Sequence, residues 1–110
     1  MTPRETGPNG FKTKFIKRVE EEFPGAIVLL MDAGYIQGVP DIFVVYGRSW
    51  AALEVKAAHN SRHQPNQDWW VTRLRDYSYA SFVYPENEEE VLNELQLAFR
   101  VSRSSRLPKP

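Results

Sequence analysis

Cysteine is absent from this chain of 110 residues, which excludes disulfide bonds and cysteine-ligated zinc sites. Long hydrophobic runs are absent too: none approaches the ~20 residues that cross a bilayer, and the first residues show no signal-peptide core. We therefore expect a cytoplasmic protein with no membrane partner. The net charge is zero, with 14 basic and 14 acidic residues, which argues against indiscriminate nucleic-acid binding.

The composition that is present fits one globular domain. Hydrophobic residues make up 42% of the chain and charged residues 25%, which is ordinary for a globular protein with a modest core. We expect a flexible N-terminal segment over residues 1–9, a single domain over residues 10–99, and a basic, disordered tail over residues 100–110.

The spacing of apolar residues predicts an α/β fold, with helices on both sides of a mixed central sheet. The first strand is expected to be buried, and Trp69 and Trp70 are expected to lie in or beside the core. The predicted elements, in chain order, are a helix over 9–23, a strand over 26–31, a hairpin over 38–56, a helix over 65–77, a strand over 79–84 and a helix over 86–99.

The hairpin, GVPDIFVVYGRSWAALEVK, carries three chemically active side chains. Asp41 opens its first strand. Glu54 and Lys56 lie two residues apart near the end of the second strand, so they point to the same face. A two-residue loop would place Asp41 directly across from Glu54, and a four-residue loop would place it across from Lys56. Either register gathers the three groups at one end of one face, whereas a plain three-residue loop would separate them.

The two carboxylates of this hairpin would repel each other unless a positive charge lay between them. Mg²⁺ suits such a place, because it prefers oxygen ligands and keeps positions for water and substrate phosphate. The carbonyl of Val55 is a candidate third ligand. Lys56 would then orient a water molecule or stabilise charge that develops on the phosphate. The structural alternative is a Pro-Asp loop end and an exposed Glu-x-Lys ion pair on an edge hairpin.

The segment Gly38–Asp41, followed by Glu54–Lys56, resembles the signature of the PD-(D/E)XK nuclease superfamily. More narrowly, it resembles the small VRR-NUC and phage Holliday-junction-resolvase-like nucleases, which also carry a Gln and a Trp where Gln67–Trp70 falls. The resemblance spans residues 11–85. It implies a restriction-endonuclease-like core, a mixed sheet with a catalytic hairpin, and metal-dependent cleavage of phosphodiester bonds.

The resemblance also assigns roles to individual residues. It implies that Asp41 and Glu54 hold Mg²⁺, with Mn²⁺ as a substitute, that Lys56 is the catalytic lysine, and that Gln67 is a fourth site residue. The implied substrate is DNA, in particular branched DNA such as a Holliday junction, and the implied setting is a bacterial cell or a phage-infected host. A junction has two strands to cut, which favours a two-fold homodimer.

The first helix departs from the family pattern, which usually supplies a further glutamate. By spacing, that position falls near Lys12, which has the opposite charge. Glu5 and Glu20 remain as candidate extra ligands, and without them the metal site has fewer ligands than usual. Two interpretations of Lys12 stay open: it lies along the apolar stripe with its charge in solvent, or it points at DNA phosphate.

Basic residues beyond the hairpin are candidate DNA contacts. Arg62 and His63 lie in the polar segment after the second strand, and Arg73 lies on the next helix, although each is also an ordinary surface residue. His59 and His63 have a spacing that binds zinc on a helix, but Pro65 argues against a helix there and no third ligand is evident. We therefore expect no zinc site.

Two alternatives to a junction-cleaving enzyme remain from the sequence. One is a nuclease for another DNA form, such as a flap, a nick or a single strand. The other is a catalytically degenerate nucleic-acid-binding module. The missing helix glutamate favours degeneracy, whereas the intact Asp41, Glu54 and Lys56 favour activity.

Overall fold

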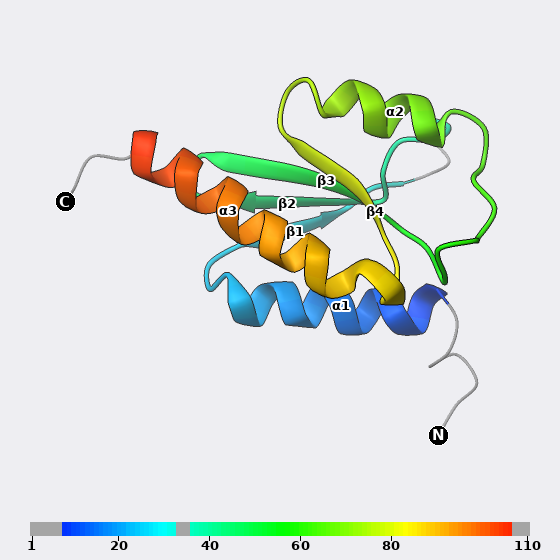
Figure 1. Ribbon diagram of the computed structural model, residues 1–110, viewed down its shortest axis with the longest axis horizontal. Helices are drawn as coiled ribbons and strands as arrows, with labels where there is room; N and C mark the ends of the chain where they lie inside the picture. Colours follow the sequence, from blue (N-terminus) through cyan, green and yellow to red (C-terminus); the bar gives the residue numbers. More distant parts are fainter. Residues whose placement is uncertain (1–7, 33–35, 107–110) are drawn as a thin grey trace.

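The computed structural model describes residues 8–32 and 36–106, which form a mixed four-stranded sheet with helices on both faces (Figure 1). The strand order is β1-β2-β3-β4, with antiparallel pairs except for the parallel pair β3–β4. This confirms the predicted α/β architecture. The elements are α1 (Pro8–Glu22), β1 (Ile27–Leu30), β2 (Ile42–Tyr46), β3 (Ser49–Val55), α2 (Gln67–Leu74), β4 (Tyr79–Val83), η2 (Pro85–Asn87) and α3 (Glu88–Arg106). Within the described residues no helix is long and apolar enough to cross a membrane.

Helices α1 and α3 lie side by side on one face of the sheet and close the main core (Figure 1). The apolar stripe predicted for the first helix faces the core: Phe15, Val19 and Phe23 are buried, and Phe11 and Ile16 are partly buried. Phe23, just after α1, packs edge-on against Phe99 of α3 with ring centroids 5.2 Å apart. The fully or nearly fully buried members of this core from the two helices are Phe15, Val19, Phe23, Val91, Leu92, Leu95 and Phe99.

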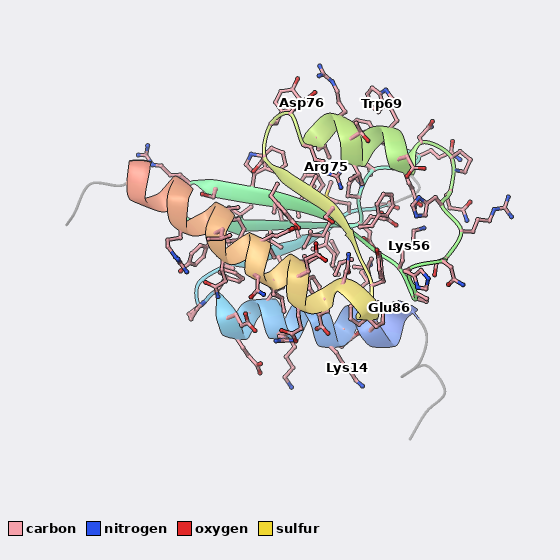
Figure 2. The ribbon with its side chains drawn as sticks, viewed as in Figure 1. Lys14, Lys56, Trp69, Arg75, Asp76 and Glu86 are labelled. Atoms are coloured by element: carbon pink, nitrogen blue, oxygen red, sulfur yellow. The ribbon has the colours of Figure 1, made fainter. Side chains whose placement is uncertain are left out.

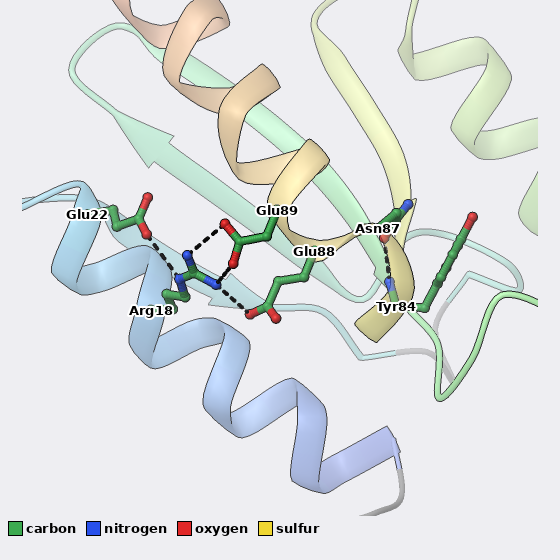
Figure 3. A network of polar contacts seen from close by, with 6 residues as sticks. All are labelled: Arg18, Glu22, Tyr84, Asn87, Glu88 and Glu89. Carbon is green, nitrogen blue, oxygen red and sulfur yellow. Dashed lines mark hydrogen bonds and ion pairs between the residues drawn. The ribbon is translucent and has the colours of Figure 1, made fainter.

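An arginine joins the two helices at the surface. The guanidinium of Arg18 on α1 bonds Glu22 at 3.0 Å and grips both carboxylate oxygens of Glu89 at the start of α3, with Glu88 at 3.6 Å (Figure 3). Beside it, the Asn87 side chain accepts a hydrogen bond from the Tyr84 backbone N–H at 2.8 Å and fixes the turn into η2. These exposed pairs link α1 to the start of α3 and contribute little stability.

The hairpin of β2 and β3 has a loop of two residues. Ile42 pairs with Leu53 and Tyr46 with Ser49, so Gly47 and Arg48 form the turn. Gly47 adopts φ 64°, which a hairpin turn of this length requires at its first central position. Continuing the register by one residue places Asp41 across from Glu54, which is the first of the two registers that the sequence left open.

Helix α2 covers the other face of the sheet mainly over β3 and β4, through a small cluster of Ala52, Val71 and Ala80. Strand β1 lies at the edge of the sheet and has little cover on this face. The prediction that it is buried was wrong, because three of its four apolar side chains are exposed: Ile27 57%, Leu29 47% and Leu30 62%.

The helix ends also differ from expectation. Helix α2 begins at Gln67 rather than Pro65, because Asn66 adopts a left-handed φ of 74°. Trp69 is 58% exposed instead of lying in the core, since α2 turns Val71 toward the sheet. Helix α3 continues to Arg106, beyond the predicted end at residue 99, because no Pro or Gly interrupts it there. Residues 1–7 and 107–110 of the predicted terminal segments lie outside the described residues.

Gly38 is where the turn before β2 touches the segment before α2. Its φ is +87°, and a Cβ there would lie 2.7 Å from the Pro65 carbonyl oxygen and from two carbon atoms of Asn66. Only a residue without a side chain fits. The contact therefore fixes the start of α2 against the start of β2.

We expect Gly38→Ala to lower the free energy of unfolding by about 1–3 kcal/mol more than Gly25→Ala does. Gly25 is the matched control, because its φ is also positive, at +92°, but a Cβ there meets nothing within 4 Å. Urea unfolding of both variants measures the difference. Equal losses would show that backbone strain alone matters and that the close contact contributes nothing.

Candidate active site

Asp41 stands at the entrance to β2, where three elements hold it. One carboxylate oxygen, Oδ1, accepts a hydrogen bond from the Val55 backbone N–H at 3.1 Å. The other, Oδ2, lies 2.9 Å from Nζ of Lys12 on α1. The Asp41 carbonyl accepts the Met31 N–H at 2.9 Å, which ties it to the end of β1. The carboxylate is thus fixed in place across β3 and α1.

Glu54 is the buried member of the acidic pair. It lies near the end of β3 on the face that α2 covers, with 7% of its surface exposed, and its Oε2 accepts a hydrogen bond from Gln67 Nε2 at 2.9 Å. Burial raises the pKa of Glu54 from an ordinary 4.5 to about 7; the charge of Asp41 adds to the rise and that of Lys56 opposes it. Glu54 therefore lies where burial disfavours the charged form of its carboxyl group.

Lys56 and Gln67 complete a continuous polar cluster. The Lys56 Nζ donates to Gln67 Oε1 at 2.6 Å and to the Arg62 carbonyl at 2.9 Å, and the same Gln67 oxygen accepts the Gln64 N–H at 2.8 Å. Lys56 and Gln67 are each 8% exposed. Gln67 thus bridges Glu54 and Lys56, because its amide presents a donor to the carboxylate and an acceptor to the ammonium.

The donor set suits a hard divalent cation. Asp41 and Glu54 offer carboxylate oxygens, and a divalent cation bound beside them would favour the ionised form of Glu54, whose pKa burial raises. The Val55 N–H faces Asp41. Since the N–H and C=O of one strand residue point to the same side, the Val55 carbonyl is directed to the edge of β3 at which Asp41 lies.

The structure thus brings together Asp41, Glu54, Lys56 and Gln67 at one end of the sheet, with Lys56 at the start of the loop that leaves β3 (Figure 2). Glu20 does not join them. It is exposed on α1, eight residues after Lys12 and so ~12 Å farther along the helix axis. Glu5 lies outside the described residues. Within residues that are described, no group of three acidic, His or Cys side chains could hold a metal.

The predicted DNA contacts are more scattered. Arg62 is exposed beside the site. The His63 ring stacks on Phe82 with centroids 4.1 Å apart, and its Nδ1 lies 2.8 Å from Asp68. Arg73 lies farther along α2, paired with Asp76 at 3.1 Å and over the Tyr77 ring. Trp69 projects from the outer side of α2 (Figure 2).

Sequence analysis missed the ion pair between Lys12 and Asp41. The signal was the position of Lys12 within the apolar stripe of α1, which turns its side chain toward the sheet. The backbone contribution of Arg62, whose carbonyl fixes Lys56, has no sequence signal because any residue offers that group.

Among solved structures, the fold is similar to that of a chain described as "VRR_NUC domain", with a TM-score of 0.62 at 23% sequence identity. The match covers 79% of this chain and 96% of that chain. No protein-family model and no curated protein matches the sequence. At this identity the likeness establishes the fold, which is the restriction-endonuclease-like α/β core that the sequence predicted.

The raised pKa of Glu54 predicts how stability depends on pH without metal. The fold favours the neutral carboxyl of Glu54, which therefore contributes to the free energy of unfolding. This contribution is complete below the ordinary pKa of 4.5 and is lost as the pH rises through about 7. We expect Glu54→Gln, which stays neutral, to raise the free energy of unfolding at about pH 8 by on the order of 1–2 kcal/mol, and to have little effect near pH 5. Urea unfolding in EDTA at both pH values measures this.

Glu21→Gln is the control, because Glu21 is an exposed acid on α1 away from the cluster. It should leave the pH dependence of the wild type unchanged. If Glu54→Gln unfolds with the same pH dependence as the wild type and Glu21→Gln, then the ionised carboxyl of Glu54 does not destabilise the fold at high pH.

Proposed function

We propose that this protein is a metal-dependent DNA endonuclease that hydrolyses phosphodiester bonds, with Mg²⁺ or Mn²⁺ as its cofactor. The observation that carries the proposal is the cluster of Asp41, Glu54, Gln67 and Lys56 at one end of the β2–β3 hairpin. The similarity of the fold to a VRR_NUC domain supports it. In this assignment Asp41, Glu54 and the Val55 carbonyl hold the cation, which supplies Lewis-acid stabilisation of the phosphate.

Lys56 is the candidate for charge stabilisation. An ammonium has three N–H donors, and within the described residues Gln67 and the Arg62 carbonyl take two of them. The third is left to orient a water molecule or to bond a phosphate oxygen. Because Lys56 is 8% exposed and held by two acceptors, its charge is preorganised rather than mobile.

Gln67 is the positioning residue of this assignment. It ties the carboxylate of Glu54 to the ammonium of Lys56 through opposite ends of one amide, at 2.9 Å and 2.6 Å. A direct ion pair between those two groups would neutralise both. The amide bonds to both instead, so that the carboxylate and the ammonium are held beside each other.

The proposed substrate is branched DNA, in particular a Holliday junction, and it rests on the family resemblance of the sequence. Flap, nicked or single-stranded DNA are the competing substrates. The pairing of Lys12 with Asp41 favours the further alternative of a degenerate nucleic-acid-binding module, since it occupies one metal-ligating oxygen. The buried, preorganised Lys56 favours activity, because a binding module has no need of it.

A junction-cleaving enzyme needs two sites, and the β1 edge offers a surface for a second copy. Exposed apolar residues of β1 adjoin a groove of about 390 Å³ on the face that α2 leaves open. An edge strand with an apolar surface can pair with the same strand of another copy. Two copies related by a two-fold axis would cover the β1 edge of each other. The groove is lined by Leu29, Met31, Phe43, Val45, Gly47, Arg48, Ser49 and Trp50.

We expect the wild type to cut DNA with Mg²⁺ or Mn²⁺ and not with EDTA. Asp41→Asn and Glu54→Gln, which remove carboxylate ligands, should each lower the rate by roughly a hundredfold or more while DNA binding persists. Lys56→Met should lower kcat with little change in Mn²⁺ affinity. The assay compares four-way-junction, flap, nicked, single-stranded and linear duplex DNA. Binding without cutting in every metal would establish the degenerate module instead.

We expect light scattering after gel filtration to show a dimer, and Leu29→Lys to yield a monomer that keeps its fold, because Leu29 lies on β1 and lines the groove. Leu97→Lys is the control, because Leu97 is 57% exposed and Leu29 47%, but Leu97 lies on α3 away from the β1 edge. A lysine on the edge opposes strand pairing, whereas one on α3 should have no effect. A dimer that persists in Leu29→Lys would place the interface elsewhere, and a monomeric wild type would overturn the proposed dimer.

A further inference from the structure

A lysine on α1 lies beside the candidate metal site. Nζ of Lys12 lies 2.9 Å from Oδ2 of Asp41, and the two side chains are 25% and 20% exposed. The charge of Lys12 also reaches Glu54, on which it acts in the same direction as Lys56. The ammonium therefore neutralises part of the charge of both carboxylates.

The ion pair and a cation compete for the same atom. Oδ1 of Asp41 is taken by the Val55 N–H at 3.1 Å, and Oδ2 is taken by Lys12. A divalent cation at Asp41 would stand within a few ångströms of the ammonium, and two positive charges at that distance repel. Lys12 must then leave, which its flexible four-carbon stem permits.

We propose that Lys12 is a built-in counter-cation of Asp41 that divalent metal displaces, and that the displaced ammonium then binds a phosphate of the substrate. This rests on the proposed function. Without metal, the ion pair holds the acid pair together. With metal and DNA, Lys12 exchanges one anionic partner for another. Metal binding alone is consequently weak, and DNA and metal strengthen each other because the phosphate accepts the released charge.

The test measures Mn²⁺ affinity in the absence of DNA by calorimetry. Lys12→Met keeps the length of the side chain and removes the charge, so it should bind Mn²⁺ roughly threefold to tenfold more tightly than the wild type. Lys12→Arg keeps the ion pair and should stay within about twofold of the wild type. Lys17→Met controls for net charge, since Lys17 is exposed on the same helix, and it should also stay within about twofold.

A second readout concerns the substrate. With saturating metal, Lys12→Met should raise the KM for DNA roughly threefold to tenfold and change kcat less, because a phosphate contact is lost. Circular dichroism checks that each variant folds. Lys12→Arg keeps the positive charge, so if it also lost affinity for DNA, the cause would be a defect in folding rather than the loss of charge.

The outcomes separate this inference from the function on which it rests. Equal Mn²⁺ affinity in the wild type and Lys12→Met, with cleavage intact, overturns the counter-cation and leaves the nuclease standing. Equal tightening in Lys17→Met also overturns it, because net charge would then be the cause. Failure of Lys12→Met to bind Mn²⁺ also overturns the counter-cation, whereas the absence of cleavage in every metal overturns the nuclease. Loss of binding in Asp41→Asn confirms that the measured ion lies at this site.

Discussion

The pairing of β2 with β3 is the constraint on which the site depends. Its two-residue turn sets a register that brings Asp41 and Glu54 to the same end of the sheet. A slip of one residue would send every side chain of one strand to the other face and separate the two acids. The α1–α3 layer stabilises that register from one side, because Leu53 and Val55 are buried in the core while Glu54 between them faces α2.

This register concentrates negative charge that the protein neutralises with its own side chains. Lys12 on α1 pairs directly with Asp41, whereas Lys56 and Glu54 both bond to the side-chain amide of Gln67 between them. These contacts hold the site together without metal. Even so, burial raises the pKa of Glu54. In our proposal a cation binds at this site by exchange, replacing the positive charge of Lys12 rather than entering an empty acidic pocket.

Much of the site could be predicted from the sequence, since its signals are local. The alternation of β3 places Glu54 and Lys56 on one face, and the Pro-Asp entry to β2 supplies the second acid. Gln67 was identified by resemblance alone, and the structure places it between those groups. Glu20 was one candidate for an extra ligand, and the structure places it away from the cluster, because a charge at the border of an apolar stripe does not say how far along the helix the site lies.

The sequence by itself determined the hairpin, the helix stripes and the candidate acids, because turn residues and periodicity act between neighbours in the chain. Only the tertiary structure decided that Lys12 meets Asp41, that Gly38 packs on the segment before α2, and that β1 is an exposed edge. These features depend on which distant elements come together and on how far α2 reaches across the sheet. Such placements follow from the packing of the whole core, and no local pattern encodes them.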